Sequence, residues 1–359
     1  MEISELIEKD LNRLYKKVNR LGKVKTELYY KDFSTLSELS EMIYGKCLDN
    51  PFPFKKNYGL DLRGVLNNDK LYNLVYKCIK GYQNMNFKIF TKVGINLSPN
   101  EKEDLIRGFL EYLGTPFFDL YKSLRNDNRI FFVDKSQIYG ESFCLPTLDS
   151  YYLCVSNKDV DDLDIIITIA HELAHIYSYR FLVNYRHSDY SLTNFLYRES
   201  LSLAFELLFY YYMLEHHIFP EIVRVNRNTI DTYILNLYKE IYYFFTAWGM
   251  DDTSIAFDGL QYTIEVDINI DDFKGKDYQF DNDYKNGDLE NISYVVGNIR
   301  AHELCDSLLN TKDKIKVINE FLMTFQYEII FQSEKLNPQI MLDGVRKRNR
   351  ELRQIYKIK

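Results

Sequence analysis

The sequence predicts a mainly α-helical fold that contains a small β-sheet. Apolar residues recur every three or four positions along most of the chain, which is the spacing of helices with one buried face. Only 7 prolines interrupt these patterns, and no glycine- or serine-rich linker is present. Between about residues 128 and 157 the pattern changes to short aromatic and β-branched runs bounded by turn residues, where we expect strands.

The first half of the chain contains two predicted helices, followed by the strands. The first helix covers residues 3–28 and has apolar side chains at helical spacing. The second begins after Ser98, which is placed to cap it together with Glu101, and it ends near residue 114. We expect the strands at residues 129–133 and 151–155.

Helices dominate the second half as well. They resume at Asp161, and one helix begins near Ser191 and must be interrupted at Pro220. Residues 265–290 are acidic and contain glycines, so we expect a solvated loop or a loose hairpin there. From Ile292 onward the chain is predicted to be helical again.

Composition excludes several classes of protein. The chain has 45 basic and 52 acidic side chains, a net charge of −7, which disfavours binding to nucleic acids or anionic membranes. Its 5 cysteines include no CxxC pair, which argues against a disulfide scaffold. The first residues lack the apolar stretch of a signal peptide, and no run approaches a membrane span. We therefore expect a cytoplasmic protein, and the sequence favours no particular oligomeric state.

The segment HELAH, from His171 to His175, is the most informative motif in the chain. Residues four apart project from one face of a helix, so both imidazoles can bind one metal ion. Glu172 then lies beside that metal, where it can hold and deprotonate a water molecule. The alternative is a surface helix with two incidental histidines, but residues 165–170 are almost wholly apolar. Because polar groups in a buried helix need partners, we expect one zinc ion per chain.

A third ligand must come from another segment, because a catalytic zinc keeps three protein ligands and one open position. Glu199 and Glu206 are seven residues apart, close to two helical turns, so their carboxylates share a face. The segment around them is almost wholly apolar, where a carboxylate needs a cation or a donor. We predict Glu199 as the ligand and Glu206 as the residue that orients a ligand. The exchanged assignment stays open.

The remaining histidines are weaker candidates. His187, His216 and His217 lie outside this apolar face, where a lone histidine is more often structural or solvated. The segment that begins at His302 resembles a second HExxH motif, but Asp306 stands where the second histidine belongs. We therefore interpret that segment as a decoy.

These segments together resemble the thimet oligopeptidase and oligoendopeptidase F family of zinc peptidases. HELAH is similar to the HExGH core of that family, with Ala174 in place of the glycine, and residues 198–206, RESLSLAFE, resemble its glutamate helix. Residues 140–164 resemble the strand, loop and acidic segment that precede the zinc helix. Residues 292–297 resemble a tyrosine-and-glycine stretch that contacts the transition state. The chain is shorter than typical members.

The resemblance implies a two-lobed helical zinc-peptidase fold in which the small β-sheet lines the active-site cleft. Residues 1–127 would form the N-terminal helical lobe and residues 128–359 the catalytic region. The substrates would be short unfolded oligopeptides, cleaved internally. The resemblance further implies that Ser202 supports the ligands, that Tyr294 stabilises the oxyanion, and that Gly140, at the start of a cleft-edge strand, allows the substrate backbone to approach.

Three other functions remain open. A helical zinc carboxypeptidase would need a cation for the C-terminal carboxylate of its substrate, and none stands out. A regulatory protease of the ImmA/IrrE type would cleave one specific protein, but the paired-glutamate helix disfavours it. A peptide-binding protein with a structural zinc is disfavoured because Glu172 is present.

Overall fold

The structure, a computed structural model, describes residues 69–83, 85, 90, 92–127, 129–133, 141–145, 150–156, 161–184, 197, 199–249, 282–327 and 336–357. The predicted helix at residues 3–28 lies outside the described residues. Within them the fold is mainly helical, as predicted. The elements follow in this order along the chain: α5 (Asp69–Gln83), α6 (Pro99–Leu113), α7 (Thr115–Asn126), β1 (Ile130–Val133), β2 (Glu141–Leu145), β3 (Ser150–Ser156), α8 (Asp162–Asn184), α10 (Ser200–Glu215), α11 (Pro220–Gly249), α13 (Asn282–Leu309), α14 (Lys314–Tyr327) and α15 (Pro338–Ile355).

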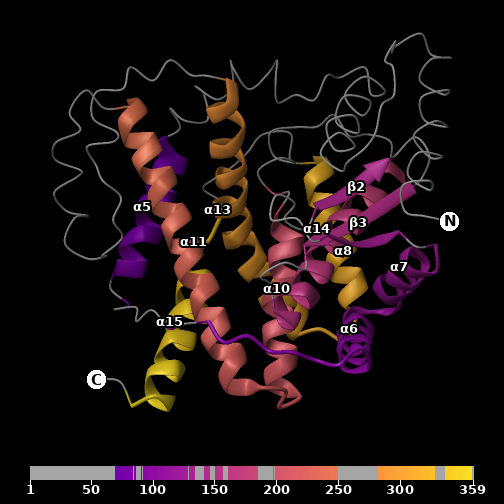
Figure 1. Ribbon diagram of the computed structural model, residues 1–359. Coiled ribbons are helices and arrows are strands. Elements are labelled where there is room, and N and C mark those ends of the chain that lie inside the picture. The colour runs from indigo at the N-terminus through magenta and orange to yellow at the C-terminus, as the bar shows by residue number, and fades with distance from the viewer. Residues whose placement is uncertain are drawn as a thin grey trace, which may run out of the picture.

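Helix α10 is the central element of the fold. It packs against α8 on one side and against α13 and α11 on the other (Figure 1). Helices α5 and α15 extend the layer formed by α11 and α13, and α6 and α7 lie near α8. The C-terminus lies at the end of α15, on the side of the molecule opposite the strands.

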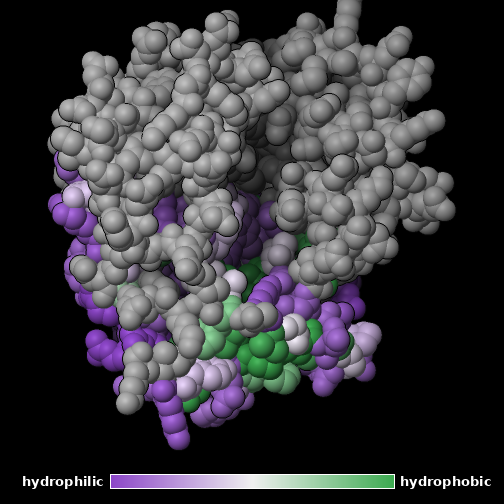
Figure 2. Space-filling view, turned by 60° about the vertical axis from the view of Figure 1, so that its left-hand side comes forward, coloured by the Kyte–Doolittle hydropathy of each residue, from purple (hydrophilic) through white to green (hydrophobic). Residues whose placement is uncertain are grey.

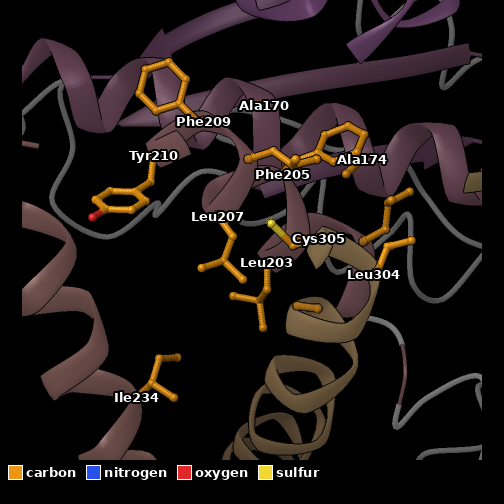
Figure 3. Close-up of a cluster of buried hydrophobic side chains, with 14 of the residues drawn as sticks. Ala170, Ala174, Leu203, Phe205, Leu207, Phe209, Tyr210, Ile234, Leu304 and Cys305 are labelled. Atoms are coloured by element: carbon orange, nitrogen blue, oxygen red, sulfur yellow. The ribbon is translucent and has the colours of Figure 1, made fainter. Parts of the chain in front are cut away.

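The hydrophobic core follows from the composition of α10. Its residues are apolar on every face, so the helix is stable only when it is covered all round. Figure 3 shows Phe205 beside Ala174 of α8, whereas Leu203 and Leu207 lie on the side of Cys305 and Ile234. These contacts bury the middle of the molecule and fix α8 relative to α13.

The strands form a three-stranded sheet with the order β1-β3-β2. Strand β3 pairs in parallel with β1 and antiparallel with β2. Strands β2 and β3 both contact α8, so the sheet lies beside the helix that carries HELAH.

The ends of two helices match the signals in the sequence. Ser98 caps α6 in a capping box: its hydroxyl accepts from the Glu101 amide, and the Glu101 carboxylate accepts from the Ser98 amide. Asp161 caps α8 by accepting from the amides of Leu163 and Asp164. The break predicted at Pro220 is also present, since α10 ends at Glu215 and α11 starts at that proline.

Two predicted boundaries were wrong. Residues 282–290 belong to α13, although we expected a loop or hairpin over 265–290. These residues have low intrinsic helix propensity, since they include two asparagines, two aspartates and a glycine. They nevertheless extend a helix whose next turns, from Ile292 onward, are buried in the core. The helix predicted to run from near Ser191 to Pro220 is not continuous, since Tyr197 and Glu199 lie in turns and α10 begins at Ser200; residues 191–196 lie outside the described residues.

The surface of the described part carries both hydrophilic and hydrophobic residues (Figure 2). One face carries a group of hydrophobic residues in its lower part, bordered by hydrophilic residues (Figure 2). Among the described helices, none has the length and hydropathy required to cross a bilayer.

Candidate metal centre

Helix α8 holds HELAH inside the molecule. Its flanking residues Ile169, Leu173 and Ala174 are buried, and the two histidines are each only 9% exposed. Four residues span slightly more than one helical turn, so the two imidazoles lie on one face of α8. Their Nε2 atoms are 3.1 Å apart. The motif therefore has the helical geometry that its spacing predicted.

Glu199 completes a group of three donors. It occupies the position before α10, and its side chain makes no capping bond to the helix. Its Oε2 atom instead lies 3.4 Å from Nε2 of His171 and 3.1 Å from Nε2 of His175. Among the described residues, His171, His175 and Glu199 form a group that could hold a metal ion, with ligand atoms all within 4.8 Å of one another.

The three donors fit a tetrahedral metal ion. Ligand bonds of about 2.0–2.1 Å at tetrahedral angles place neighbouring ligand atoms about 3.3 Å apart. The observed separations are 3.1, 3.1 and 3.4 Å. Two imidazole nitrogens and a carboxylate are also the donor set that zinc favours. Charge and spacing therefore both fit a small divalent cation.

Glu206 contacts the ring nitrogen of His171 that is not part of this donor group. Its Oε1 atom lies 2.7 Å from Nδ1 of His171, the ring nitrogen that faces away from the three donors. A carboxylate there holds the proton on Nδ1 and leaves the lone pair of Nε2 for a metal. Glu199 is fixed in turn by Ser202, whose hydroxyl donates to the Glu199 Oε2 at 3.2 Å and to its carbonyl oxygen at 3.0 Å.

The local electrostatics favour a positive charge. Burial alone would lower the pKa of His171, but hydrogen bonds to Glu199 and Glu206 outweigh burial and raise that pKa well above 6.5. The nearby charge of Glu172 acts in the same direction. A site that stabilises a proton on this ring also stabilises a metal cation beside it.

Glu172 lies one residue after the first histidine and is 5% exposed. Its negative charge acts to raise the pKa of the neighbouring His171. Glu172 is not itself one of the three donors.

Helix α13 lies against the start of α10. Gly297 contacts the backbone of Glu199, and Tyr294 lies one turn earlier on the same face of the helix. Tyr294 is half-buried and packs against the core. The sequence pattern predicted that residues 292–297 contact a substrate. It did not predict that Gly297 contacts Glu199. A glycine inside a predicted helix is the available signal for such a contact.

Gly140 and the remaining histidines are not part of this donor group, which is defined among the described residues. Gly140 and His187 lie outside the described residues. His216 and His217 are exposed at the end of α10. His302 is buried far along α13, where burial and then the guanidinium groups of Arg348 and Arg227 lower its pKa well below 6.5. Among the described residues, His302 is not in the group that could hold a metal ion.

Comparison with known proteins gives a likeness of fold. No protein-family model matches the chain, and no curated protein matches it. The crystal structure of a putative peptidase from Chlamydophila abortus is similar to this chain, with a TM-score of 0.53 and 18% sequence identity. The similarity covers 89% of this chain and 61% of the other. This chain therefore shares its fold with part of a longer protein.

Proposed function

We propose that the protein is a zinc-dependent metalloendopeptidase that hydrolyses peptide bonds in short unfolded oligopeptides. The observation that carries this proposal is the group of three donors, His171, His175 and Glu199, with a buried glutamate beside it. The likeness of fold to a protein described as a peptidase supports the same reaction class. In this proposal one zinc ion per chain is held by the three donors.

The metal, when bound, would supply a Lewis acid that polarises a water molecule and the scissile carbonyl group. Glu172 accepts the proton of the attacking water and delivers it to the leaving amine. Glu206 keeps His171 oriented, and Ser202 keeps Glu199 in place. Tyr294 donates a hydrogen bond to the carbonyl oxygen as negative charge develops on it.

The proposed substrate is an extended peptide. In the two-lobed arrangement that the sequence resemblance implies, the small sheet lines the cleft, and the peptide pairs with an edge strand. The strand concerned would be β2, which follows Gly140 directly and pairs with β3 along its other edge. Backbone pairing of this kind selects unfolded peptides, because a folded protein does not offer a free strand.

The test separates the metal from the chemistry. The purified protein should contain one zinc per chain and cut many short quenched peptides internally, as read by mass spectrometry. Glu172→Gln should keep the zinc and the fold but lose about 10²–10⁴-fold in turnover, because an amide cannot accept the proton. Glu303→Gln is the matched control, since Glu303 also follows a helical histidine but pairs with Arg300 outside the site.

Specific outcomes would contradict the proposal. Absence of a transition metal from gently purified protein, or normal turnover of the Glu172→Gln variant, would exclude this mechanism. Stepwise trimming from the C-terminus would indicate a carboxypeptidase instead. Cleavage of a single protein and of no short peptide would indicate a regulatory protease.

A further inference from the structure

Gly297 lies at the closest approach of α13 to the proposed ligand Glu199. A Cβ atom added at Gly297 would lie 3.0 Å from the Cβ of Glu199, 3.1 Å from its carbonyl carbon and 3.2 Å from the amide nitrogen of Ser200. Non-bonded carbon atoms are most stable at about 3.5–4.0 Å. None of the three contacted atoms can rotate away, because they belong to the backbone or are bonded directly to it.

The helical backbone at residue 297 does not by itself require a glycine. Helix α13 continues through it, and its neighbours Val296 and Asn298 are buried. A glycine in the interior of a helix is less favourable than an alanine. The close packing on Glu199 is therefore the feature that requires a glycine at this position.

We propose that Gly297 is a positioning residue for Glu199: its missing side chain lets α13 hold the backbone of this ligand in place. The inference rests on the proposed metal site. Ser202 fixes the carboxylate of Glu199 from α10, and α13 fixes its main chain from the other side. Metal–ligand bonds tolerate errors of only about 0.2 Å, so a displacement of roughly half an ångström at this backbone would weaken the site.

The experiment compares two glycine-to-alanine substitutions within helices. Gly297→Ala introduces the contact with Glu199. Gly344→Ala, in α15, is the matched control, because its Cβ would meet only side-chain atoms, Nδ1 of His302 at 3.3 Å and Nη1 of Arg348 at 3.4 Å, and neither residue belongs to the proposed metal site. Both variants gain the same helix propensity. For each full-length protein, Co²⁺ affinity is measured by competition with a chelator, together with the visible absorption spectrum of bound Co²⁺.

The expected result is a loss of Co²⁺ affinity of about 10–100-fold in Gly297→Ala, the usual effect of removing a residue that supports a ligand. Its Co²⁺ spectrum should also change, whereas Gly344→Ala should match the wild type in both measurements. Circular dichroism of the metal-free proteins reports whether each variant folds. Folding lost in Gly297→Ala without metal would assign the glycine to general helix packing and overturn the inference.

The inference and the proposed function fail in different ways. A wild-type protein that binds no Co²⁺ or Zn²⁺ would overturn the proposed function and this inference with it. A wild-type protein that binds metal, with unchanged affinity and spectrum in Gly297→Ala, would overturn the inference alone.

Discussion

At the scale of single residues, the buried Glu199 and the partly buried Glu206 lie on different sides of one imidazole. Glu199 approaches the Nε2 atoms of both histidines, whereas Glu206 approaches only Nδ1 of His171. The two ring nitrogens of a metal-binding histidine have separate roles, one toward the metal and one toward a supporting acceptor. These contacts are the basis for proposing Glu199 as a metal ligand and Glu206 as the residue that orients His171.

This difference predicts unequal effects of two alanine substitutions. Glu199→Ala should abolish stable zinc binding, because it removes one of three ligand atoms. Glu206→Ala should weaken zinc binding by about 10–100-fold, because it only releases the orientation of His171. Titration of the metal-free proteins with zinc checks both values. Loss of the metal in Glu206→Ala but not in Glu199→Ala would show that the two roles are exchanged.

Local spacing explains why most site residues could be predicted. His171, Glu172 and His175 follow from a spacing of about one helical turn, and the seven-residue separation of Glu199 and Glu206 indicates that their carboxylates share a face. The approach of these carboxylates to His171 depends on how α10 packs against α8. The contact of Gly297 with Glu199 could not be predicted in this way. It depends on how two helices that are distant in sequence cross, and no local pattern records that crossing.

At the scale of elements, a buried ion cluster joins α11 to α15. Asp231 accepts hydrogen bonds from Arg227, one turn earlier in α11, and from Arg348 of α15 at 2.8 and 2.9 Å. All three side chains are buried. Burial alone would raise the pKa of Asp231, but the two guanidinium groups outweigh it and lower the pKa to about 2.

The lowered pKa predicts how stability depends on pH. The folded state favours the charged carboxylate, so the contribution of Asp231 is complete above the unfolded pKa, about 4, and is lost as the pH falls toward 2. Its size is on the order of 2 kcal/mol. Urea unfolding between pH 2 and 6 should show this loss in the wild type and not in Asp231→Asn. An identical acid dependence in both proteins would contradict the assignment.

The same variant should be destabilised at neutral pH. Asp231→Asn leaves two buried guanidinium groups without a counter-charge, which costs about 3–5 kcal/mol. Asp343→Asn is the control on α15, because Asp343 pairs with Arg346 at the exposed surface, where such pairs contribute about 0–1 kcal/mol. Comparison of the free energies of unfolding tests the difference.

At the scale of the whole molecule, the proposed metal centre connects separate helices. Its donors come from α8 and from the residue before α10, and α13 packs directly on that residue. Most predicted helices were found because their signals are local, as at Ser98 and Pro220. The arrangement of α10 between its neighbours could not be predicted, since a helix that is apolar on every face does not indicate which side meets which neighbour.

Metal removal should therefore lower the stability of the whole fold. A ligand at 100 times its Kd stabilises the state that binds it by about 2.7 kcal/mol, so a chelator should reduce the Tm of the wild type measurably. His175→Ala should show no such shift because it removes a ligand, whereas Glu172→Gln should shift like the wild type. Differential scanning calorimetry with and without chelator tests this, and an unchanged wild-type Tm would contradict a metal that bridges helices.

The position of α13 late in the chain also has a consequence for the order of folding. During synthesis, α8 and α10 emerge before α13, so all three donors are available while the helix that packs on Glu199 is still missing. Contacts between distant segments form slowly, because the intervening chain must first be ordered. We therefore expect a nascent chain that stops before α13 to bind zinc weakly and the completed chain to bind it tightly. High-affinity metal uptake would then mark the end of folding rather than its beginning.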